Sequence, residues 1–228
     1  RIDEKLELQQ KRIEALKEQK KGMMQKIFSQ EIRFKDDDGK DYPEWEEKKL
    51  GDVGEIITGG TPQTRKSDNF GDDYMWATPV DLGKTKYILN TNRRLSQLGL
   101  KSIKSINKGA ILITCIGSTI GKLGISMAKM GTNQQINSIE CKPDHNFEFL
   151  YYALLIDINM IIRYASTQAV PIINKTTLSK LKIPLPTLPE QTKIANFLSA
   201  LDRRIELEEQ KLQESKQFKK GLMQRMFI

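Results

Sequence analysis

Apolar residues recur with helical spacing at both ends of the chain, on alternating three- and four-residue steps. This is the spacing of a heptad seam and predicts a coiled coil. The N-terminal seam positions are Ile2, Leu6, Gln9, Ile13, Leu16, Lys20, Met23 and Ile27, and the C-terminal ones are Leu201, Ile205, Glu208, Leu212, Ser215, Lys219, Leu222 and Met226. An amphipathic helix packed into a core is the alternative interpretation.

The two terminal segments are copies of each other. Residues 2–28 align with residues 201–227 at a constant offset of 199 without a gap, and ten of the 27 positions are identical. A repeat of this kind indicates duplication of a structural unit. One helix enters the segment between them and the other leaves it, so we predict that they pair antiparallel. Gly22 and Gly221 lie at equivalent interior positions, where each costs about 1 kcal/mol relative to alanine, which suggests a close packing partner.

The second helix has a recognisable start. Thr187, Pro189 and Glu190 fit a capping box, with Thr187 as N-cap and Glu190 at the third helical position. The segment before it contains short apolar runs separated by turn residues, which predict strands at Glu55–Thr58, Tyr74–Ala77, Ala110–Ile116, Gly124–Met127 and Asn137–Cys141. Phe147–Tyr164 has helical spacing. We therefore predict an α/β (α+β) fold with one globular domain at 29–187 between long helices at 1–28 and 188–228.

The distribution of charge changes this picture more than the net charge of +8 does. Residues 31–55 carry five basic and ten acidic side chains, whereas residues 56–142 carry twelve basic and five acidic ones. A basic middle segment is typical of a phosphate-facing surface, although solvated lysines are common on any protein.

Composition narrows the class of protein. With 29% charged residues and a mean hydropathy of −0.50, the sequence is that of a folded, soluble chain. It has no apolar run of the roughly 20 residues that a bilayer requires. Cys115 and Cys141 lie in strand-like runs without metal-type spacing, so we expect free thiols in a cytoplasmic protein. The chain opens at Arg1 within a helical pattern, which suggests a fragment.

Motifs at both junctions resemble the specificity (S) subunits of type I restriction-modification enzymes. The run Ile183–Gln191, followed by Lys193–Ala195 and Leu198–Asp202, is similar to the end of a target recognition domain as it passes into a spacer helix. Phe28–Phe34, Gly39 and Trp45–Val53 resemble the junction from the central spacer helix into the second recognition domain. Gly59–Pro62, Gly109–Ile113 and Gly117–Lys122 resemble inner motifs of that domain.

The resemblance implies a subunit that reads DNA and performs no chemistry. In that family the S subunit holds methyltransferase (M) subunits, which use S-adenosylmethionine, and recruits restriction (R) subunits, which use ATP and Mg²⁺. A whole S subunit has two recognition domains for a split target, and this chain has one. We therefore expect a half subunit that needs no cofactor itself and reads one half-site of double-stranded DNA. Two copies could form a homodimer that reads an interrupted palindrome.

Two sets of residues are candidates for binding. Polar side chains on glycine- or proline-marked loops are candidate base or phosphate contacts, since a rigid core can present them to a groove. They are Thr61, Gln63, Thr64, Arg65, Lys66, Arg93, Arg94, Lys122, Asn133, Gln134, Gln135, Thr167 and Gln168. The second set consists of positions of the terminal repeat that are either apolar and off the seam or glycine, and these are candidates for docking the M subunit. They are Leu8, Gly22, Met24, Phe28, Leu207, Gly221, Met223 and Phe227. For each residue, a solvated or structural role is the alternative.

Signs of catalysis are weak. The segment 111–122 imitates a phosphate loop, but its glycine spacing is one residue short and Leu123 stands where Ser or Thr is required. His145 is the only histidine, and the acidic runs at 36–38 and 72–73 are typical of solvated turns. A metal-dependent nuclease and a coiled-coil scaffold whose middle domain binds protein remain the alternative functions.

Overall fold

The computed structural model describes residues 2–158, 162–163 and 172–226. Its contacts divide the chain into two compact units, one formed by residues 1–41 with 193–228 and the other by residues 42–192. Residues 29–41 join the helical unit because Phe34 packs edge-on against Phe197 and Asp37 pairs with Lys193 at 2.7 Å. The division into a globular recognition domain at 29–187 and spacer helices at 1–28 and 188–228 stays a prediction.

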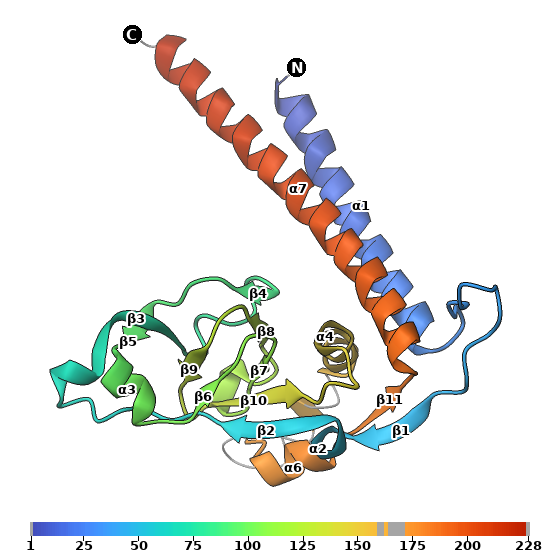
Figure 1. The fold of residues 1–228 in the computed structure, drawn as a ribbon. Coiled ribbons are helices and arrows are strands. Elements are labelled where there is room, and N and C mark those ends of the chain that lie inside the picture. Colours follow the sequence, from blue (N-terminus) through green and yellow to red (C-terminus); the bar gives the residue numbers. More distant parts are fainter. Residues whose placement is uncertain (1, 159–161, 164–171, 227–228) are drawn as a thin grey trace. The chain divides into compact units, whose positions relative to one another are not determined.

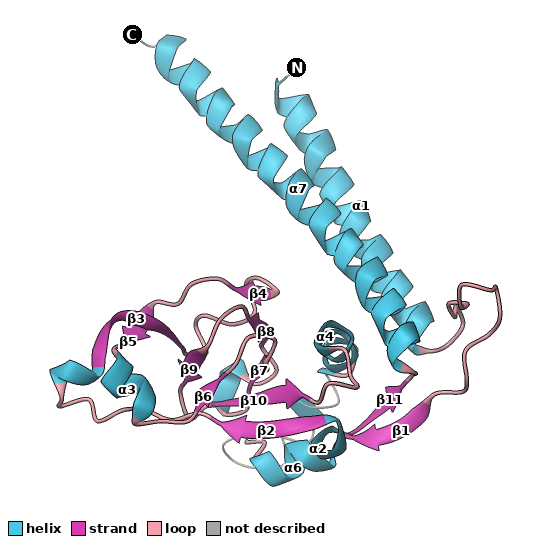
Figure 2. Cartoon of the chain, viewed as in Figure 1, coloured by secondary structure: helices cyan, strands magenta, loops and turns pink. Residues whose placement is uncertain are grey.

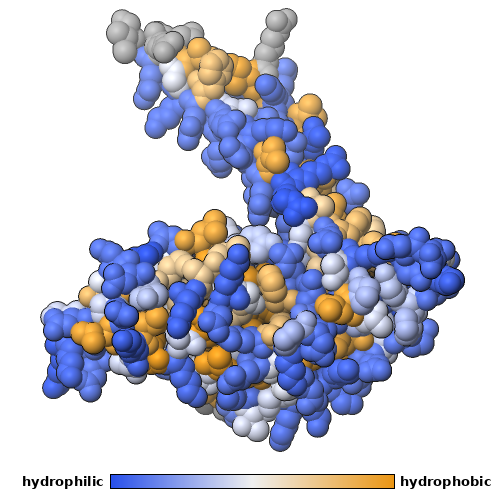
Figure 3. All heavy atoms as spheres, in the orientation of Figure 1, coloured by the Kyte–Doolittle hydropathy of each residue, from blue (hydrophilic) through white to orange (hydrophobic). Residues whose placement is uncertain are grey.

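Two long helices form the first unit. Helix α1 (Ile2–Phe28) lies beside α7 (Leu188–Met226), and ion pairs join Asp3 to Lys219 and Lys20 to Asp202, which makes the pair antiparallel (Figure 1). We call α1 and the part of α7 from Lys193 onward the helix pair. The space-filling view shows a mainly hydrophilic surface on these helices, with separate hydrophobic patches (Figure 3). Their apolar contact is narrow, as the heptad spacing predicts. The buried apolar residues among the described part of the helix pair are Ile13, Leu16, Met24, Ile27, Ile194, Ala195, Leu198, Ile205 and Leu212.

The seam departs from the predicted register near the end of α1. Met24 is 5% exposed, whereas Met23 is only half-buried, so the expectation that Met24 lies off the seam is wrong. With the half-buried Lys20 between Leu16 and Met24, the contact positions from Ile13 to Ile27 step by three, four, four and three. A helix of 3.6 residues per turn drifts by about 20° per heptad, which brings the next residue onto the contact face.

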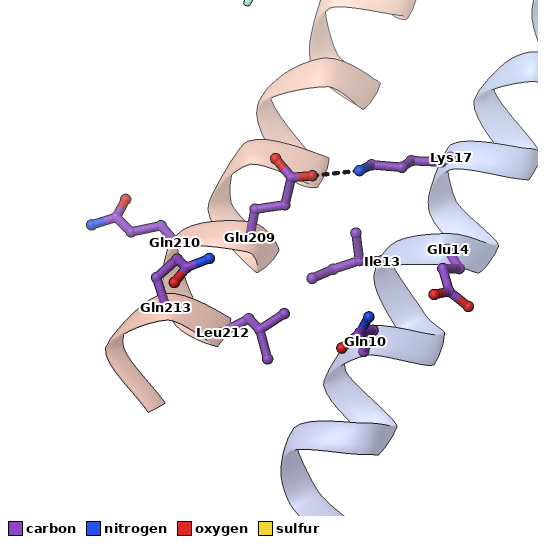
Figure 4. A pocket seen from close by; sticks show the side chains of 8 residues that line it. All are labelled: Gln10, Ile13, Glu14, Lys17, Glu209, Gln210, Leu212 and Gln213. Atoms are coloured by element: carbon purple, nitrogen blue, oxygen red, sulfur yellow. Dashed lines mark ion pairs between the residues drawn. The ribbon is translucent and has the colours of Figure 1, made fainter. Parts of the chain in front are cut away.

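The helix pair has an internal twofold relation. Asp3 and Asp202 are equivalent in the sequence repeat, as are Lys20 and Lys219, and each aspartate pairs with the lysine of the other helix. In the close view, the equivalent residues Ile13 and Leu212 point toward one another across the groove (Figure 4). Each copy of the duplicated helix therefore meets the other copy with the same residues.

The second unit contains two larger sheets and a small one (Figure 2). The five-stranded sheet has the order β2-β10-β7-β8-β4, and the four-stranded sheet has the order β5-β3-β9-β6. Strand pairs β3·β9 and β4·β8 are parallel, and the others are antiparallel. The strands are β1 (Glu46–Lys49), β2 (Gly54–Thr58), β3 (Phe70–Ala77), β4 (Tyr87–Ile88), β5 (Arg93–Leu95), β6 (Ser105–Ile106), β7 (Ile111–Thr114), β8 (Leu123–Ser126), β9 (Met130–Thr132), β10 (Ile136–Cys141) and β11 (Lys182–Leu185).

Residues from both sheets share one hydrophobic core. Strand β7 is buried along its whole length, in agreement with the apolar run of its first three residues, Ile111–Ile113. The shared core consists of Ile57, Met75, Ala77, Leu82, Ile88, Ile106, Ala110, Leu112, Met130 and Ile136. A second hydrophobic cluster consists of Trp76, Leu95 and Leu100. The α/β fold with two long antiparallel helices is thus confirmed.

Short helices begin at side-chain caps. Ser96 caps α3 (Gln97–Lys101), Asn146 caps α4 (Phe147–Ile156) and Asn174 caps α6 (Lys175–Lys180), while α2 (Leu50–Val53) has no such cap. Each cap accepts a hydrogen bond from a backbone N–H of the first turn, which has no partner within the helix. The predicted helix at 147–164 is described as helical to Ile156, and much of the rest of that range lies outside the described residues.

Helix α7 begins one residue after Thr187, as predicted, but the expected capping bond is absent. The Thr187 hydroxyl is buried and has no hydrogen-bond partner among the described residues. Glu190 instead accepts a 3.1 Å hydrogen bond from the Trp45 indole. The capping-box prediction is therefore wrong for the Thr187 side chain, although the helix begins where the sequence predicts.

Candidate nucleic-acid interface

The Gly59–Thr61 turn lies directly against the loop that follows β9. The Gly59 amide donates to the Ile136 carbonyl at 3.0 Å, and the Gly60 amide donates to the Thr132 carbonyl at 2.8 Å. A Cβ atom added at Gly59 would lie 2.1 Å from the Asn133 carbonyl oxygen. Glycine is therefore required for the two loops to approach, and two of the predicted clusters, 61–66 and 133–135, are brought together.

Within this contact, the Thr61 hydroxyl donates a hydrogen bond to Oε1 of Gln134. Asn133 and Gln135 bond to one another, through Asn133 Nδ2 to Gln135 Oε1 and Gln135 N to Asn133 Oδ1, both at 3.1 Å. Asn133 is 8% exposed, whereas Gln134 is exposed. The three neighbouring amides thus differ: two of them stabilise the loop, and the third is presented on its surface.

An aromatic platform holds one predicted arginine beside the same turn. The Arg93 guanidinium lies 4.9 Å from the ring centre of Phe70 and 4.8 Å from that of Trp76. The Trp76 indole donates a 3.1 Å hydrogen bond to the Gly60 carbonyl, which links the platform to the Gly59–Thr61 turn. Stacking fixes the plane of the guanidinium and leaves its N–H edge for a carboxylate, phosphate or guanine.

The loop between the Gly59–Thr61 turn and β3 is tied at its base. The buried Asn69 side chain donates to the Gln63 carbonyl at 3.0 Å, and the Lys66 amide donates to the same carbonyl at 3.2 Å. The side chains of Gln63, Thr64, Arg65 and Lys66 are exposed on this loop. A fixed backbone with exposed polar side chains suits contact with a groove or a phosphate backbone.

Most basic side chains of residues 56–142 are exposed and form no ion pair with any described residue. Eight of them also form no side-chain hydrogen bond or ring contact with any described residue: Arg65, Lys66, Lys84, Lys101, Lys104, Lys108, Lys122 and Lys129. In the flanking segments, by contrast, Lys48, Lys182 and Lys193 each pair with a carboxylate. Cations without local partners leave a positive field that attracts polyanions.

Lys86, one of the twelve basic residues of this segment, does not belong to the exposed set. It is 7% exposed, its Nζ donates to the Tyr152 hydroxyl at 2.9 Å, and it pairs with Glu148 at 3.4 Å. Its charge also lies over the rings of Tyr87 and Tyr152, at 4.8 and 4.6 Å. Lys86 therefore anchors β4 to α4, and burial removes it from any phosphate-facing surface.

Other predicted contact residues lie apart from this cluster or are engaged locally. Arg94 donates to the Asp72 carbonyl at 3.0 Å and to Asn90 Oδ1 at 3.3 Å. Lys122 lies at the end of the β7–β8 hairpin, where its side chain runs alongside Gly83. Thr167 and Gln168 lie outside the described residues.

The loop at 115–121 is a hairpin connection and does not form a phosphate cradle. Gly117 and Gly121 have positive φ angles of 77° and 89°, which glycine tolerates without a steric cost. The Gly121 amide donates to the Thr114 carbonyl at 3.0 Å, and the Lys122 amide donates to the Thr114 hydroxyl at 3.0 Å. These amides are consumed within the turn, which agrees with the weak phosphate-loop signal.

The described residues contain no cluster of three or more histidine, cysteine or acidic side chains that could hold a metal ion. Burial lowers the pKa of His145 and raises the pKa of the Cys115 and Cys141 thiols to about 11 and 12. Both thiols are therefore protonated and unreactive at neutral pH. No helix in the described part of the chain is long and apolar enough to cross a membrane.

The candidate docking residues of the helix pair differ in accessibility. Leu8, Leu207 and Met223 are 69%, 53% and 49% exposed, whereas Phe28 is half-buried. At Gly22 and Gly221, an added Cβ would meet no atom within 4 Å. The described part of the chain therefore supplies no close packing partner for either glycine, and Phe227 lies outside it.

Sequence reasoning missed Phe70, Trp76 and the burial of Lys86. Phe70 and Trp76 look like ordinary core residues in the sequence, and nothing there reveals that β5 pairs with β3 to place Arg93 over them. The three tyrosines at 87, 151 and 152 were a possible signal for Lys86, since a lysine beside aromatic residues on two elements can be caged by them.

Known proteins that are similar to this chain include specificity subunits of type I restriction enzymes. The chain is 34% identical over 188 residues to the type I restriction enzyme MjaIX specificity subunit of Methanocaldococcus jannaschii, covering 78% of this chain and 43% of that protein. It is 37% identical over 112 residues to the HindI specificity subunit of Haemophilus influenzae, covering 48% and 24%. The chain thus spans less than half the length of these two relatives.

Solved structures show the same fold. The HsdS subunit from Thermoanaerobacter tengcongensis superposes with a TM-score of 0.64 at 21% identity, covering 98% of this chain and 54% of that one. The type I S subunit from M. genitalium gives 0.68 at 15% identity, covering 97% and 56%. The family model described as the type I restriction modification DNA specificity domain matches residues 42–217. The chain therefore belongs to the family of type I restriction-modification DNA specificity domains.

Proposed function

We propose that this chain reads one half of a bipartite target in double-stranded DNA and performs no chemistry itself. The observation that carries the proposal is the convergence of Thr61, Gln134 and Arg93, each held by a contact within the domain, in a chain of this family. Side chains fixed by neighbouring contacts are suited to direct readout of base edges. The eight exposed basic side chains without an ion pair, hydrogen bond or ring contact among the described residues supply the attraction to phosphate.

Salt dependence tests the electrostatic part of this proposal. Each phosphate contact contributes about 0.9 to the slope of log K against log salt. With the cognate M subunit present, Lys66→Gln is expected to reduce that slope by about one and to weaken binding on all sequences alike. Lys182→Gln is the matched control, because Lys182 pairs with Glu47 at 2.9 Å. Binding to duplex DNA that depends on neither salt nor sequence would favour a protein-binding scaffold.

The partners follow from the relatives, which are specificity subunits of type I restriction enzymes. We propose that the chain joins M subunits, which supply S-adenosylmethionine-dependent methylation in the cytoplasm, and through them R subunits. The exposed Leu8, Leu207 and Met223, with the open faces at Gly22 and Gly221, are the proposed docking positions. Aspartate at both Leu8 and Leu207 is expected to weaken M binding; unchanged M binding would refute this assignment.

We also propose that two copies of this chain act together on an interrupted palindrome. The reciprocal pairs Asp3–Lys219 and Lys20–Asp202 support this proposal. They show that the two copies of the duplicated helix pack with twofold symmetry, which is also the symmetry of a dimer of two identical chains. A helix of 27 residues is about 40 Å long, close to one DNA turn of roughly 34 Å. Sequencing the sites methylated in a random library by the chain with M is the test. A contiguous or asymmetric site would exclude the dimer.

A further inference from the structure

Gln134 lies in a loop whose backbone is fixed on both sides. The Asn133 amide donates to the Ala77 carbonyl at 2.9 Å, and the Ile136 amide donates to the Asn133 carbonyl at 3.1 Å. The side chains of Asn133 and Gln135 bond to one another and stabilise the same turn. Gln134 is the exposed amide of the three, so its own contact decides how its side chain is oriented.

The contact with Thr61 sets that orientation. The Thr61 hydroxyl donates to Oε1 of Gln134, which takes one of the two lone pairs on that oxygen. The second lone pair and both N–H groups of Nε2 remain for a ligand. The amide therefore offers one acceptor and one donor side by side from a fixed position.

Among the four bases, adenine matches this pair of groups. Its major-groove edge presents the N6 amino group as donor and N7 as acceptor, which a glutamine amide contacts in bidentate fashion. Guanine presents two acceptors there, cytosine one donor and thymine one acceptor with a methyl group. Arg93 lies next to the same turn through Trp76 and Gly60, and the exposed Arg65 and Lys66 follow Thr61 in the chain. The amide thus lies among cations that would hold the phosphate backbone.

We propose that Gln134 is a specificity-determining residue that reads adenine at one position of the half-site, and that Thr61 is the positioning residue that holds its amide. This inference rests on the proposed DNA-reading function. It also assigns Asn133 and Gln135 to the support of the loop and not to base contacts.

Exchange of the amide for a carboxylate tests the proposal. Gln134→Glu keeps the length of the side chain and its bond from Thr61 but removes both donors. A carboxylate accepts from the cytosine N4 amino group, so we expect preference at one position to change from adenine to cytosine. The experiment selects bound duplexes from a randomised library with the chain and its M subunit, and compares wild type with variant position by position. Gln135→Glu is the matched control and is expected to leave every preference unchanged.

Thr61 is tested by removing and restoring its hydroxyl. Thr61→Val keeps the shape of the side chain and is expected to relax discrimination at that same position by about five- to 150-fold, the range of one bidentate contact. Thr61→Ser, which keeps the hydroxyl, is expected to restore it. Thermal melting identifies any variant that fails to fold, and a merely structural role for Thr61 would alter stability without a change confined to one base position.

The possible outcomes distinguish failure of the Gln134 assignment from failure of the proposed DNA-reading function. If wild type selects a defined sequence but Gln134→Glu selects the same sequence, Gln134 does not read a base and the inference is wrong, while the DNA-reading function stands. A uniform loss of affinity without a change of preferred base would place Gln134 on the phosphate backbone, which also overturns the inference. If wild type with M selects no sequence at all, the proposed function itself fails.

Discussion

A disulfide between the two helices tests the antiparallel pairing most directly. Ile13 and Leu212 are 5% and 7% exposed and point toward one another across the groove (Figure 4). Cysteines at these two positions are expected to form a bond within one chain. The native thiols do not compete, because burial raises the pKa of Cys115 to about 11 and that of Cys141 to about 12, which suppresses the thiolate at pH 8.

The size of the effect follows from the closed loop. The bond would close a loop of 200 residues, for which the chain-entropy model gives about 5 kcal/mol at 25 °C. This is an upper bound, since residues 42–192 shorten the flexible part of the loop if they stay folded when the helices separate. We therefore expect a higher melting temperature under oxidising than under reducing conditions.

Non-reducing electrophoresis and the mass of the oxidised protein provide the measurement. An intramolecular bond gives a monomer of unchanged mass apart from two hydrogens, with altered mobility. The single variants Ile13→Cys and Leu212→Cys are the controls and should stay reduced. Crosslinks that form only between chains, or none at all, would refute the pairing within one molecule.

Three further predictions concern stability and the loop contact. Gly59→Ala is expected to lower both the melting temperature and DNA affinity, because its Cβ would lie 2.1 Å from a backbone carbonyl oxygen; Gly60→Ala, whose nearest contact is the Ile103 side chain at 3.2 Å, should change them far less. Lys86→Met is expected to lower the free energy of unfolding, measured by urea titration, by about 3 kcal/mol. This is the low end for breaking a buried ion pair, because the partner carboxylate of Glu148 is 21% exposed. Unchanged stability would contradict the role of Lys86 in joining β4 to α4. Glu208 accepts a hydrogen bond from Lys211, which lowers its pKa, so its stabilisation is present above the ordinary pKa and is lost as the pH falls through the lowered value. Thermal melting at pH 7 and pH 3.5 should therefore show a smaller loss for Glu208→Gln than for wild type, and an equal loss would refute this account.

Helix positions could be predicted from the sequence because their causes are local. Seam spacing and the repeat at an offset of 199 identified both long helices, and α7 begins directly after the predicted Thr187. Strands appeared as apolar runs between turn residues, since side-chain alternation and turn chemistry act over a few residues. The junction motifs, Ile183–Gln191 in particular, were enough to identify the family.

Contacts between distant segments were decided only by the tertiary structure. The bond between Thr61 and Gln134 joins residues 73 apart, and it depends on how the Gly59–Thr61 turn packs against the loop after β9. Arg93 could be chosen as a candidate, but its aromatic platform exists only because β5 pairs with β3.

The dependence of burial on distant segments also explains where the sequence misled us, at Lys86 and Met24. Lys86 and the exposed lysines look alike in sequence, yet burial among tyrosines makes one of them an anchor. Met23 and Met24 are adjacent methionines, and the drift of a real helix from the ideal heptad determined which of them faces α7. Periodicity fixes which residues belong to a helix or strand, whereas burial and pairing depend on the neighbours that the whole chain brings to each residue.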